Sequence, residues 1–127
     1  MEIKGSKVLV VEDGNFDRQF LVELLKEEGV KEVFTARNGL EGQEIILKNE
    51  DLDLVISDYN MDKLDGMQLL EWLRKNVNSK INKILFIMIT AAPPYDRIYG
   101  KAKEIGASDV LFKPFRSQSL IDAINDL

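Results

Sequence analysis

The sequence predicts an α/β domain in which five parallel strands form one sheet flanked by five helices. Three observations favour this class. Short apolar runs alternate along the chain with longer segments whose apolar residues recur at helical spacing. Glycine, asparagine and proline residues that favour turns stand between the two kinds of segment. The 127 residues are also close to the usual size of one domain, so a single domain is expected over residues 1–127.

Five apolar runs are the expected strands, because each is short and contains β-branched or aromatic residues. They cover residues 7–13, 32–36, 53–58, 83–90 and 109–112. The expected helices lie between and after them, at 15–29, within 38–50 after a turn at Asn38-Gly39, and at 65–76, 96–105 and 117–127. An alternation of this kind is typical of βαβ units with right-handed crossovers and a parallel sheet.

Local signals mark the ends of several helices. In the first, Asn15 is a plausible N-cap and Gly29 a plausible stop. The apolar residues at helical spacing in this segment are Phe16, Phe20, Leu21, Leu24 and Leu25. Asp65 is expected to begin the third helix, and Gly106 to end the fourth. The third helix carries its inner face on or near Met67, Leu70, Trp72 and Leu73.

The strand order follows from hydrophobicity. The first, third and fourth strands are apolar on both faces and belong in the centre of the sheet, whereas the second and fifth are shorter or more mixed and belong at the edges. The order 2-1-3-4-5 satisfies this requirement. Ligands of such sheets bind beyond the carboxyl ends of the strands, near the point where the strand order reverses.

Composition excludes several classes of protein. The chain is 45% hydrophobic and 31% charged, as expected of a soluble globular domain. Its net charge of −5 argues against direct nucleic-acid binding, because attraction to phosphates requires a basic face. No apolar run approaches the ~20 residues of a membrane span, and the first residues lack the features of a signal peptide. We expect neither membrane nor nucleic acid as a partner.

Cysteine and histidine are both absent. Disulfides and thiolate zinc sites are therefore excluded, and a reducing cytoplasm is the expected location. The lack of histidine also removes the commonest general base and metal ligand. Any chemistry must use carboxylates, hydroxyls, lysine or a bound metal.

Polar residues stand at four of the predicted strand ends. The first strand ends in Glu12 and Asp13, the third in Asp58 and the fourth in Thr90, and the fifth leads directly into Lys113. Taken singly, each residue has an ordinary structural explanation as a turn, cap, strand or surface residue. Together they converge on one edge of the sheet. Three carboxylates in one cleft repel each other, which favours a bound cation.

Hard oxygen ligands without histidine or cysteine indicate Mg²⁺. A carboxylate cluster with Mg²⁺, a lysine and a threonine meets the needs of phosphoryl transfer. The cations neutralise the phosphoryl oxygens, the hydroxyl donates to one of them, and Asp58 is suited to attack phosphorus and hold the group as an acyl phosphate.

These residues belong to a set of segments that resembles the receiver domain of two-component response regulators, with a length similar to CheY-type proteins. The segments, in order, are "VLVVED", "ARNGLEG", "VISDYNMDKLDG", "ITA" and "GASDVLFKPF". Each is weak alone, but the order and spacing together are specific, and the resemblance covers essentially the whole chain. It implies the flavodoxin-like fold of that family and a function as a signalling switch.

The resemblance also implies a role for each site residue. Asp58 would be the phospho-acceptor, and Thr90 and Lys113 would contact the phosphoryl group. Mg²⁺ would be bound by Asp13, Asp58 and the backbone carbonyl of Asn60, with Glu12 helping through water. A cis peptide bond is implied between Lys113 and Pro114.

The same resemblance sets expectations about activity and partners. The phosphoryl group would come from a sensor histidine kinase or a phosphotransfer protein. An unidentified output protein would bind the face formed by the last two helices and the strand between them. The chain would act as a switch that assists its own phosphorylation and slow dephosphorylation, and not as an enzyme with a separate substrate.

Three positions and one loop depart from the family pattern. Asp62 replaces the usual proline and would add negative potential at the cleft mouth. Val110 stands where relatives carry tyrosine or phenylalanine, so an aromatic switch is missing or reassigned to Phe112 or Tyr99. Ala92, which cannot orient water, stands at a position that tunes phosphate lifetime. The loop with Pro93 and Pro94, followed by Tyr95, is one residue longer than in CheY.

The sequence disfavours three other functions. An aspartate-nucleophile phosphatase of the haloacid dehalogenase type requires D-x-D after the first strand, where this chain has "EDG". A flavodoxin-type FMN protein needs a Ser-, Thr- and Gly-rich phosphate loop there, whereas "EDGNFD" is acidic and would repel phosphate. An inactive receiver used for dimerisation is disfavoured because all matching site residues are present.

Overall fold

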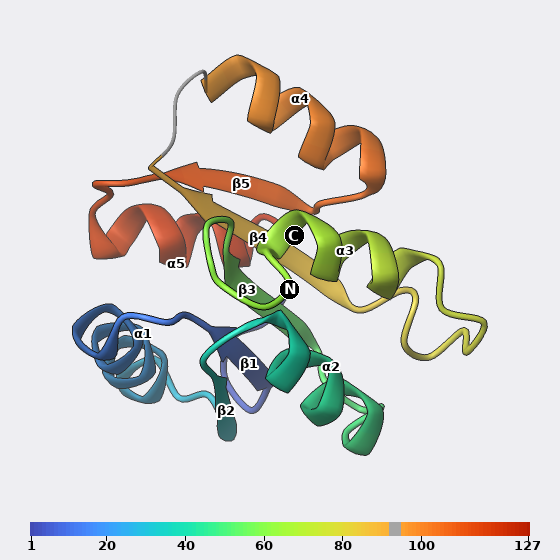
Figure 1. Cartoon of the computed structure of the whole chain (residues 1–127). Coiled ribbons are helices and arrows are strands. Elements are labelled where there is room, and N and C mark those ends of the chain that lie inside the picture. Colours follow the sequence, from blue (N-terminus) through green and yellow to red (C-terminus); the bar gives the residue numbers. More distant parts are fainter. Residues whose placement is uncertain (92–94) are drawn as a thin grey trace.

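The computed structural model describes residues 1–91 and 95–127, and all of their side chains except those of residues 95 and 96. Strands and helices alternate along this part of the chain (Figure 1). The strands are β1 (Lys7–Val11), β2 (Glu32–Ala36), β3 (Leu54–Asp58), β4 (Leu85–Thr90) and β5 (Asp109–Phe112). The helices are α1 (Asn15–Glu27), α2 (Gly39–Lys48), α3 (Gly66–Arg74), α4 (Tyr95–Ile105) and α5 (Ser117–Asn125).

All neighbouring strands pair in parallel, and their order in the sheet is β2-β1-β3-β4-β5. The predicted fold class and strand order are therefore confirmed. The register aligns the carboxyl ends of the central strands, since Val11 of β1 lies opposite Ser57 of β3, and Asp58 lies opposite Ile89 of β4. Residues that follow these positions consequently gather at one edge of the sheet.

Helices cover both faces of the sheet (Figure 1). On one face, α1 and α5 pack against alternate strand residues such as Val10, Ile56 and Ile87. On the other face, α2, α3 and α4 pack against the intervening residues, among them Leu9 and Phe86. The strands contribute apolar residues to both layers, which is why their sequences read as continuous apolar runs instead of alternating patterns.

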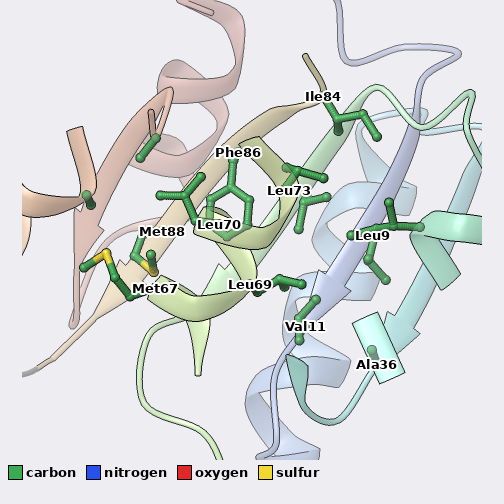
Figure 2. Close-up of a cluster of buried hydrophobic side chains, with 14 of the residues drawn as sticks. Leu9, Val11, Ala36, Met67, Leu69, Leu70, Leu73, Ile84, Phe86 and Met88 are labelled. Carbon is green, nitrogen blue, oxygen red and sulfur yellow. The ribbon is translucent and has the colours of Figure 1, made fainter. Parts of the chain in front are cut away.

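The core under α3 is fully closed to water. Leu69, Leu70 and Leu73 of this helix are 0% exposed. Leu70 and Leu73 lie beside Phe86 of β4, whereas Leu69 lies toward Val11 of β1 (Figure 2). Burial of each such side chain contributes about 1.5–3 kcal/mol relative to an exposed position. This packing fixes α3, and with it the loop that connects α3 to the end of β3.

Most helix ends agree with the sequence signals. Asp65 caps α3 in a capping box, in which its side chain accepts from the backbone of Gln68 and the Gln68 side chain accepts from the backbone of Asp65. Gly29 follows the end of α1 with a φ of 88°, a conformation that glycine adopts without strain. Some ends were predicted too long, since α1 stops at Glu27 and α5 at Asn125.

The prediction that Asn15 is an N-cap is wrong. The N-cap is Gly14, and Asn15 is already the first helical residue. The side-chain oxygen of Asn15 accepts a hydrogen bond from Arg18, so it is directed toward the guanidinium and does not cap the helix.

The apolar stripe of α1 is only partly covered by the sheet. Leu21, Val22 and Leu25 are buried, whereas Phe16 is 84% exposed and Phe20 is 41% exposed. Within the described residues, no helix has the length and apolar character that a membrane crossing requires.

Candidate functional site

Three acidic side chains meet at the carboxyl edge of the sheet. Glu12 and Asp13 follow β1, and Asp58 is the last residue of β3. Each offers one carboxylate oxygen, and these oxygens lie within 4.8 Å of one another. Glu12 is buried, Asp58 is partly buried and Asp13 is exposed. The convergence predicted from the strand ends is therefore present in the structure.

Glu12 is positioned by the backbone on both sides. Its own N–H continues the ladder of β1 by donating to the carbonyl of Ala36 at 3.0 Å, and the N–H of Gly14 donates to its Oε2 at 2.9 Å. Burial raises the pKa of the Glu12 carboxyl, and the nearby negative charge of Asp58 adds to this effect, while the Gly14 hydrogen bond opposes it. The carboxylate is thus held in place at a position where its charge is costly.

Asp58 sits at a point where the backbone is crowded. The N–H of Tyr59 donates to the carbonyl of Ile89 at 2.8 Å, so the chain remains tied to β4 just after Asp58. A Cβ atom at residue 66 would lie 2.3 Å from the Asp58 carbonyl oxygen, so only glycine allows α3 to begin here. Burial raises the pKa of the Asp58 carboxyl, and the positive charge of Lys113 opposes this shift.

Lys113 follows β5 and inserts its ammonium among carboxylates. Nζ lies 3.1 Å from Oε1 of Glu12, 3.3 Å from Oδ2 of Asp17 and 3.7 Å from Oδ2 of Asp58. Burial alone would lower the pKa of Lys113, but its acidic neighbours outweigh this effect and the pKa is raised. The raised pKa favours the protonated form, so the side chain places a positive charge beside Asp58.

Thr90 is the last residue of β4 and is buried, with 1% exposure. Its carbonyl accepts a hydrogen bond from the backbone N–H of Lys113 at 2.9 Å, which joins the ends of β4 and β5. The residues predicted to supply the hydroxyl and the ammonium are therefore neighbours across two strands. The peptide bond between Lys113 and Pro114 is cis, as the resemblance implied.

Asp17 and Arg18 were missed by the sequence analysis. Asp17 pairs with Lys113, and Arg18 donates from Nη1 to the carbonyl of Glu12 at 2.9 Å. Both residues lie in the first turn of α1, not at a strand end. The available signal was their position, because a helix that follows the first strand must begin at the same edge of the sheet as Glu12.

The other predicted positions lie around this cluster. Asn60 and Asp62 are exposed in the loop between β3 and α3, and Asp62 is not a member of the group of three carboxylates. Val110 is buried in the core. The rings of Tyr99 and Phe112 are in contact, with centroids 6.4 Å apart. The predictions for Ala92 and for the loop 93–95 concern positions at or beside residues 92–94, which lie outside the described residues.

The site combines excess negative charge with hard oxygen donors. One ammonium faces Glu12, Asp17 and Asp58, and the exposed carboxylate of Asp13 adjoins them. Oxygen ligands of this kind fit Mg²⁺ or a similar hard divalent cation. An apolar hollow of about 290 Å³ adjoins the site, lined by parts of α1 and of the segment after β5, including Phe16, Phe20 and Phe115.

A doubly wound sheet in this order, with carboxylates and a lysine at its carboxyl edge, agrees with the arrangement expected from the resemblance to receiver domains. The chain belongs to the response regulator receiver domain family, whose model matches residues 8–125.

The chain is similar to chemotaxis proteins of the CheY type and to other receiver domains. A probable chemotaxis protein CheY of Rhizobium etli is 39% identical over 119 residues, which are 93% of this chain and 88% of that protein. The structure of the CheY4 chemotaxis response regulator of Vibrio cholerae aligns with a TM-score of 0.84 at 29% identity, covering 95% of this chain and 97% of the other. A receiver domain protein of Clostridium thermocellum gives a TM-score of 0.85 at 34% identity, covering 95% and 92%.

Family membership bears on two of the three alternative functions. Because the chain belongs to the receiver family, the phosphatase and the FMN protein are no longer supported. An inactive receiver would belong to the same family, so activity depends on the chemistry of the site.

Proposed function

We propose that this chain is a phosphorylation-controlled switch that accepts a phosphoryl group on Asp58 with the help of Mg²⁺. The observation that carries this proposal is the meeting of Glu12, Asp13 and Asp58 at the carboxyl edge of the sheet, where Lys113 pairs with Glu12 and Asp58. A cluster with only a structural role would have little reason to place repelling carboxylates where water cannot separate their charges.

In the proposed reaction, one carboxylate oxygen of Asp58 attacks the phosphorus of a phosphohistidine on a donor protein. The P–O bond forms as the P–N bond breaks, and the imidazole leaves with the electron pair. The product is an acyl phosphate on Asp58 and a free histidine on the donor. A separate donor is required because this chain has no histidine, and a sensor histidine kinase or phosphotransfer protein meets this need.

The residues around Asp58 would divide the remaining work. The carboxylates of Asp13 and Asp58, with the backbone carbonyl of Asn60, would hold Mg²⁺, and Glu12 would help through water. The ion supplies positive charge to the phosphoryl oxygens when bound. The Lys113 ammonium would neutralise another phosphoryl oxygen. The Thr90 hydroxyl would donate a hydrogen bond to the same group.

We infer that the chain is a switch and not an enzyme with a separate substrate, since the group that reacts is its own side chain. It would assist transfer to Asp58 and slow loss of the group. An output protein would bind the face of α4, β5 and α5, where Tyr99 contacts Phe112. A cytoplasmic location is part of this proposal, because the ATP that charges a histidine kinase is found there.

Labelling with a small acyl phosphate and Mg²⁺ tests the acceptor. Intact-mass measurement should find one added phosphoryl group on wild type and none on Asp58→Asn. The matched control is Asp53→Asn, just before the other end of β3, where the carboxylate accepts from the backbone of Lys7. This control should be labelled like wild type. Full labelling of Asp58→Asn would refute the assignment.

The role of Thr90 concerns transmission of the signal. Thr90→Ala should still bind beryllofluoride, a phosphoryl mimic, but the amide chemical-shift changes that it causes in β5 should be smaller than in wild type. Thr35→Ala, exposed on the edge strand β2, is the matched control and should respond fully. If beryllofluoride changes the β5 chemical shifts of Thr90→Ala as much as those of wild type, transmission through this hydroxyl is excluded.

A further inference from the structure

Lys113 has an acidic partner that the proposed function does not use. Its Nζ donates to Oε1 of Glu12 at 3.1 Å and to Oδ2 of Asp17 at 3.3 Å. The ion pair with Asp58 is longer, at 3.7 Å, which is beyond hydrogen-bonding distance. Two of the three ammonium hydrogens are therefore engaged by carboxylates other than the predicted phospho-acceptor, and one of these carboxylates, Asp17, belongs to α1.

Asp17 is held near Lys113 by contacts of the chain around it. Its neighbour Arg18 donates from Nη1 to the backbone carbonyl of Glu12 at 2.9 Å and to that of Asp13 at 3.5 Å, which ties the first turn of α1 to the end of β1. A Cβ atom at Gly14 would lie 3.4 Å from Oε2 of Glu12 and 3.9 Å from Oδ2 of Asp17. The two carboxylates thus converge on one short, anchored turn.

We propose that Asp17 is a positioning residue that holds Lys113 on the α1 side of the site until a phosphoryl group occupies Asp58. This inference rests on the proposed function. A phosphoryl group brings a charge of about −1.5 to −2, whereas Asp17 has a single charge on a side chain that is 54% exposed and therefore screened by water. Lys113 would therefore pair with the phosphoryl group, but its ion pair with Asp17 would have to break, which weakens the net gain.

Removal of the Asp17 charge should favour the occupied site. Asp17→Asn keeps the shape of the side chain and frees Lys113 to move toward Asp58. In saturating Mg²⁺, calorimetric titration with beryllofluoride should give a dissociation constant about 1.5- to fivefold lower than that of wild type, the range set by an exposed ion pair. Asp17→Glu retains the carboxylate and should return the affinity toward the wild-type value.

A general gain from deleting any negative charge must be separated from an effect through Lys113. In the Lys113→Met background, Asp17→Asn should give no gain, because the residue through which it acts is missing. Glu23→Gln removes a charge from the same helix, where the carboxylate accepts a hydrogen bond from Gln19, and should leave the affinity unchanged. Equal gains with and without Lys113, or an equal gain in Glu23→Gln, would overturn the proposal.

The outcomes separate this inference from the proposed function. Failure of wild type to bind beryllofluoride would overturn the proposed function and this inference with it. Binding by wild type, with equal or weaker binding by Asp17→Asn, would overturn the role of Asp17 alone. If Lys113→Met variants bind too weakly to titrate, the comparison of Asp17→Asn with Asp17→Glu and Glu23→Gln decides.

Discussion

Two lysines, one at the amino ends of the strands and one at the carboxyl ends, each contact three carboxylates. Lys7 begins β1. Its ammonium pairs with Asp51 and lies 3.8 Å from Glu32, and its backbone N–H donates to Asp53 at 2.9 Å. Lys113 follows β5 and meets Glu12, Asp17 and Asp58. The two clusters are alike in composition, so their difference must arise from their surroundings.

That difference is access to water. The side chains of Asp51 and Glu32 are 64% and 48% exposed. At the Lys113 end Asp17 is similarly open, at 54%, but Glu12 and Asp58 are only 4% and 12% exposed. At the exposed end, the hydrogen bond from Lys7 holds the pKa of Asp51 below its usual value. At the buried end, burial raises the pKa values of Glu12 and Asp58 despite the adjacent lysine.

The contrast shows when an acidic cluster indicates a site. Carboxylates in water are satisfied by one lysine and by solvent, and such surface pairs contribute little to stability. Carboxylates shut away from water repel each other, and one ammonium does not offset that repulsion. The carboxyl edge of the sheet is therefore the end at which a further cation is expected to stabilise the fold.

Mg²⁺ should have the largest effect, and only through the buried cluster. A cation that binds only the folded arrangement stabilises it by about 2.7 kcal/mol at a hundredfold excess over Kd. Each kcal/mol moves Tm by roughly 3–6 °C for a domain of this size, so wild type should melt roughly 8–16 °C higher in Mg²⁺ than in EDTA. Thermal melts in the two buffers measure this shift.

Variants in the two lysine clusters show which cluster binds the Mg²⁺ that raises Tm. Asp58→Asn removes a ligand and should reduce the Mg²⁺ shift, whereas Asp51→Asn should keep it in full. A full shift in Asp58→Asn would mean that the metal binds elsewhere.

Without metal, the Asp58→Asn substitution is expected to raise stability, whereas in Mg²⁺ it removes part of the stabilisation. In EDTA, Asp58→Asn removes one repelling charge from the buried cluster and should raise stability, by on the order of 1 kcal/mol, the usual size of a point-mutation effect. Asp51→Asn removes the partner of Lys7 and should lower stability slightly. Urea unfolding of the three proteins in EDTA measures both signs. A less stable Asp58→Asn protein would make Asp58 a structural residue like Asp51.

Much of the fold and of the cluster at the carboxyl edge could be predicted from the sequence. Parallel strands bring their carboxyl ends to one edge, so the positions of Glu12, Asp58 and Lys113 followed once the strands were recognised. The strands were recognisable because both of their faces are buried, which leaves long apolar runs. The cap at Asp65 was predictable for a similar reason, since the capping box is encoded within four residues.

The misses all depend on how elements pack. The spacing of Phe16 and Phe20 resembles that of Leu21 and Leu25, and spacing alone does not reveal which half of a wide apolar stripe the sheet covers. The role of Asp17 required the angle at which α1 leaves β1, which Arg18 fixes through backbone carbonyls. The exposed cluster at Lys7 was not predicted either, because Asp51 and Glu32 are ordinary surface residues in the sequence.

The smallest expected effect is a pH dependence that differs in sign between the two ends. The folded-state pKa of Asp58 is raised, so as pH rises the unfolded chain loses this proton before the folded protein does. Stability then falls with rising pH, and the penalty is complete only above the folded pKa. The pKa of Asp51 is lowered, so its contribution is favourable at neutral pH and is lost as pH falls through the folded value.

Both variants should therefore approach wild type on acidification, but from opposite sides. In EDTA at about pH 7, Asp58→Asn should be more stable than wild type and Asp51→Asn slightly less stable. At about pH 4, near the ordinary pKa of an aspartate in an unfolded chain, wild type is substantially protonated at Asp58 and the advantage of Asp58→Asn should shrink. Urea unfolding at several pH values between these limits measures the Asp58 difference, whereas the Asp51 difference closes only below about pH 4, because the folded pKa of Asp51 is lowered, and its series must extend there. An advantage of Asp58→Asn that is constant or grows on acidification would show that the ionised carboxylate is not under strain, and the distinction between the two lysine clusters would then have to rest on metal binding alone.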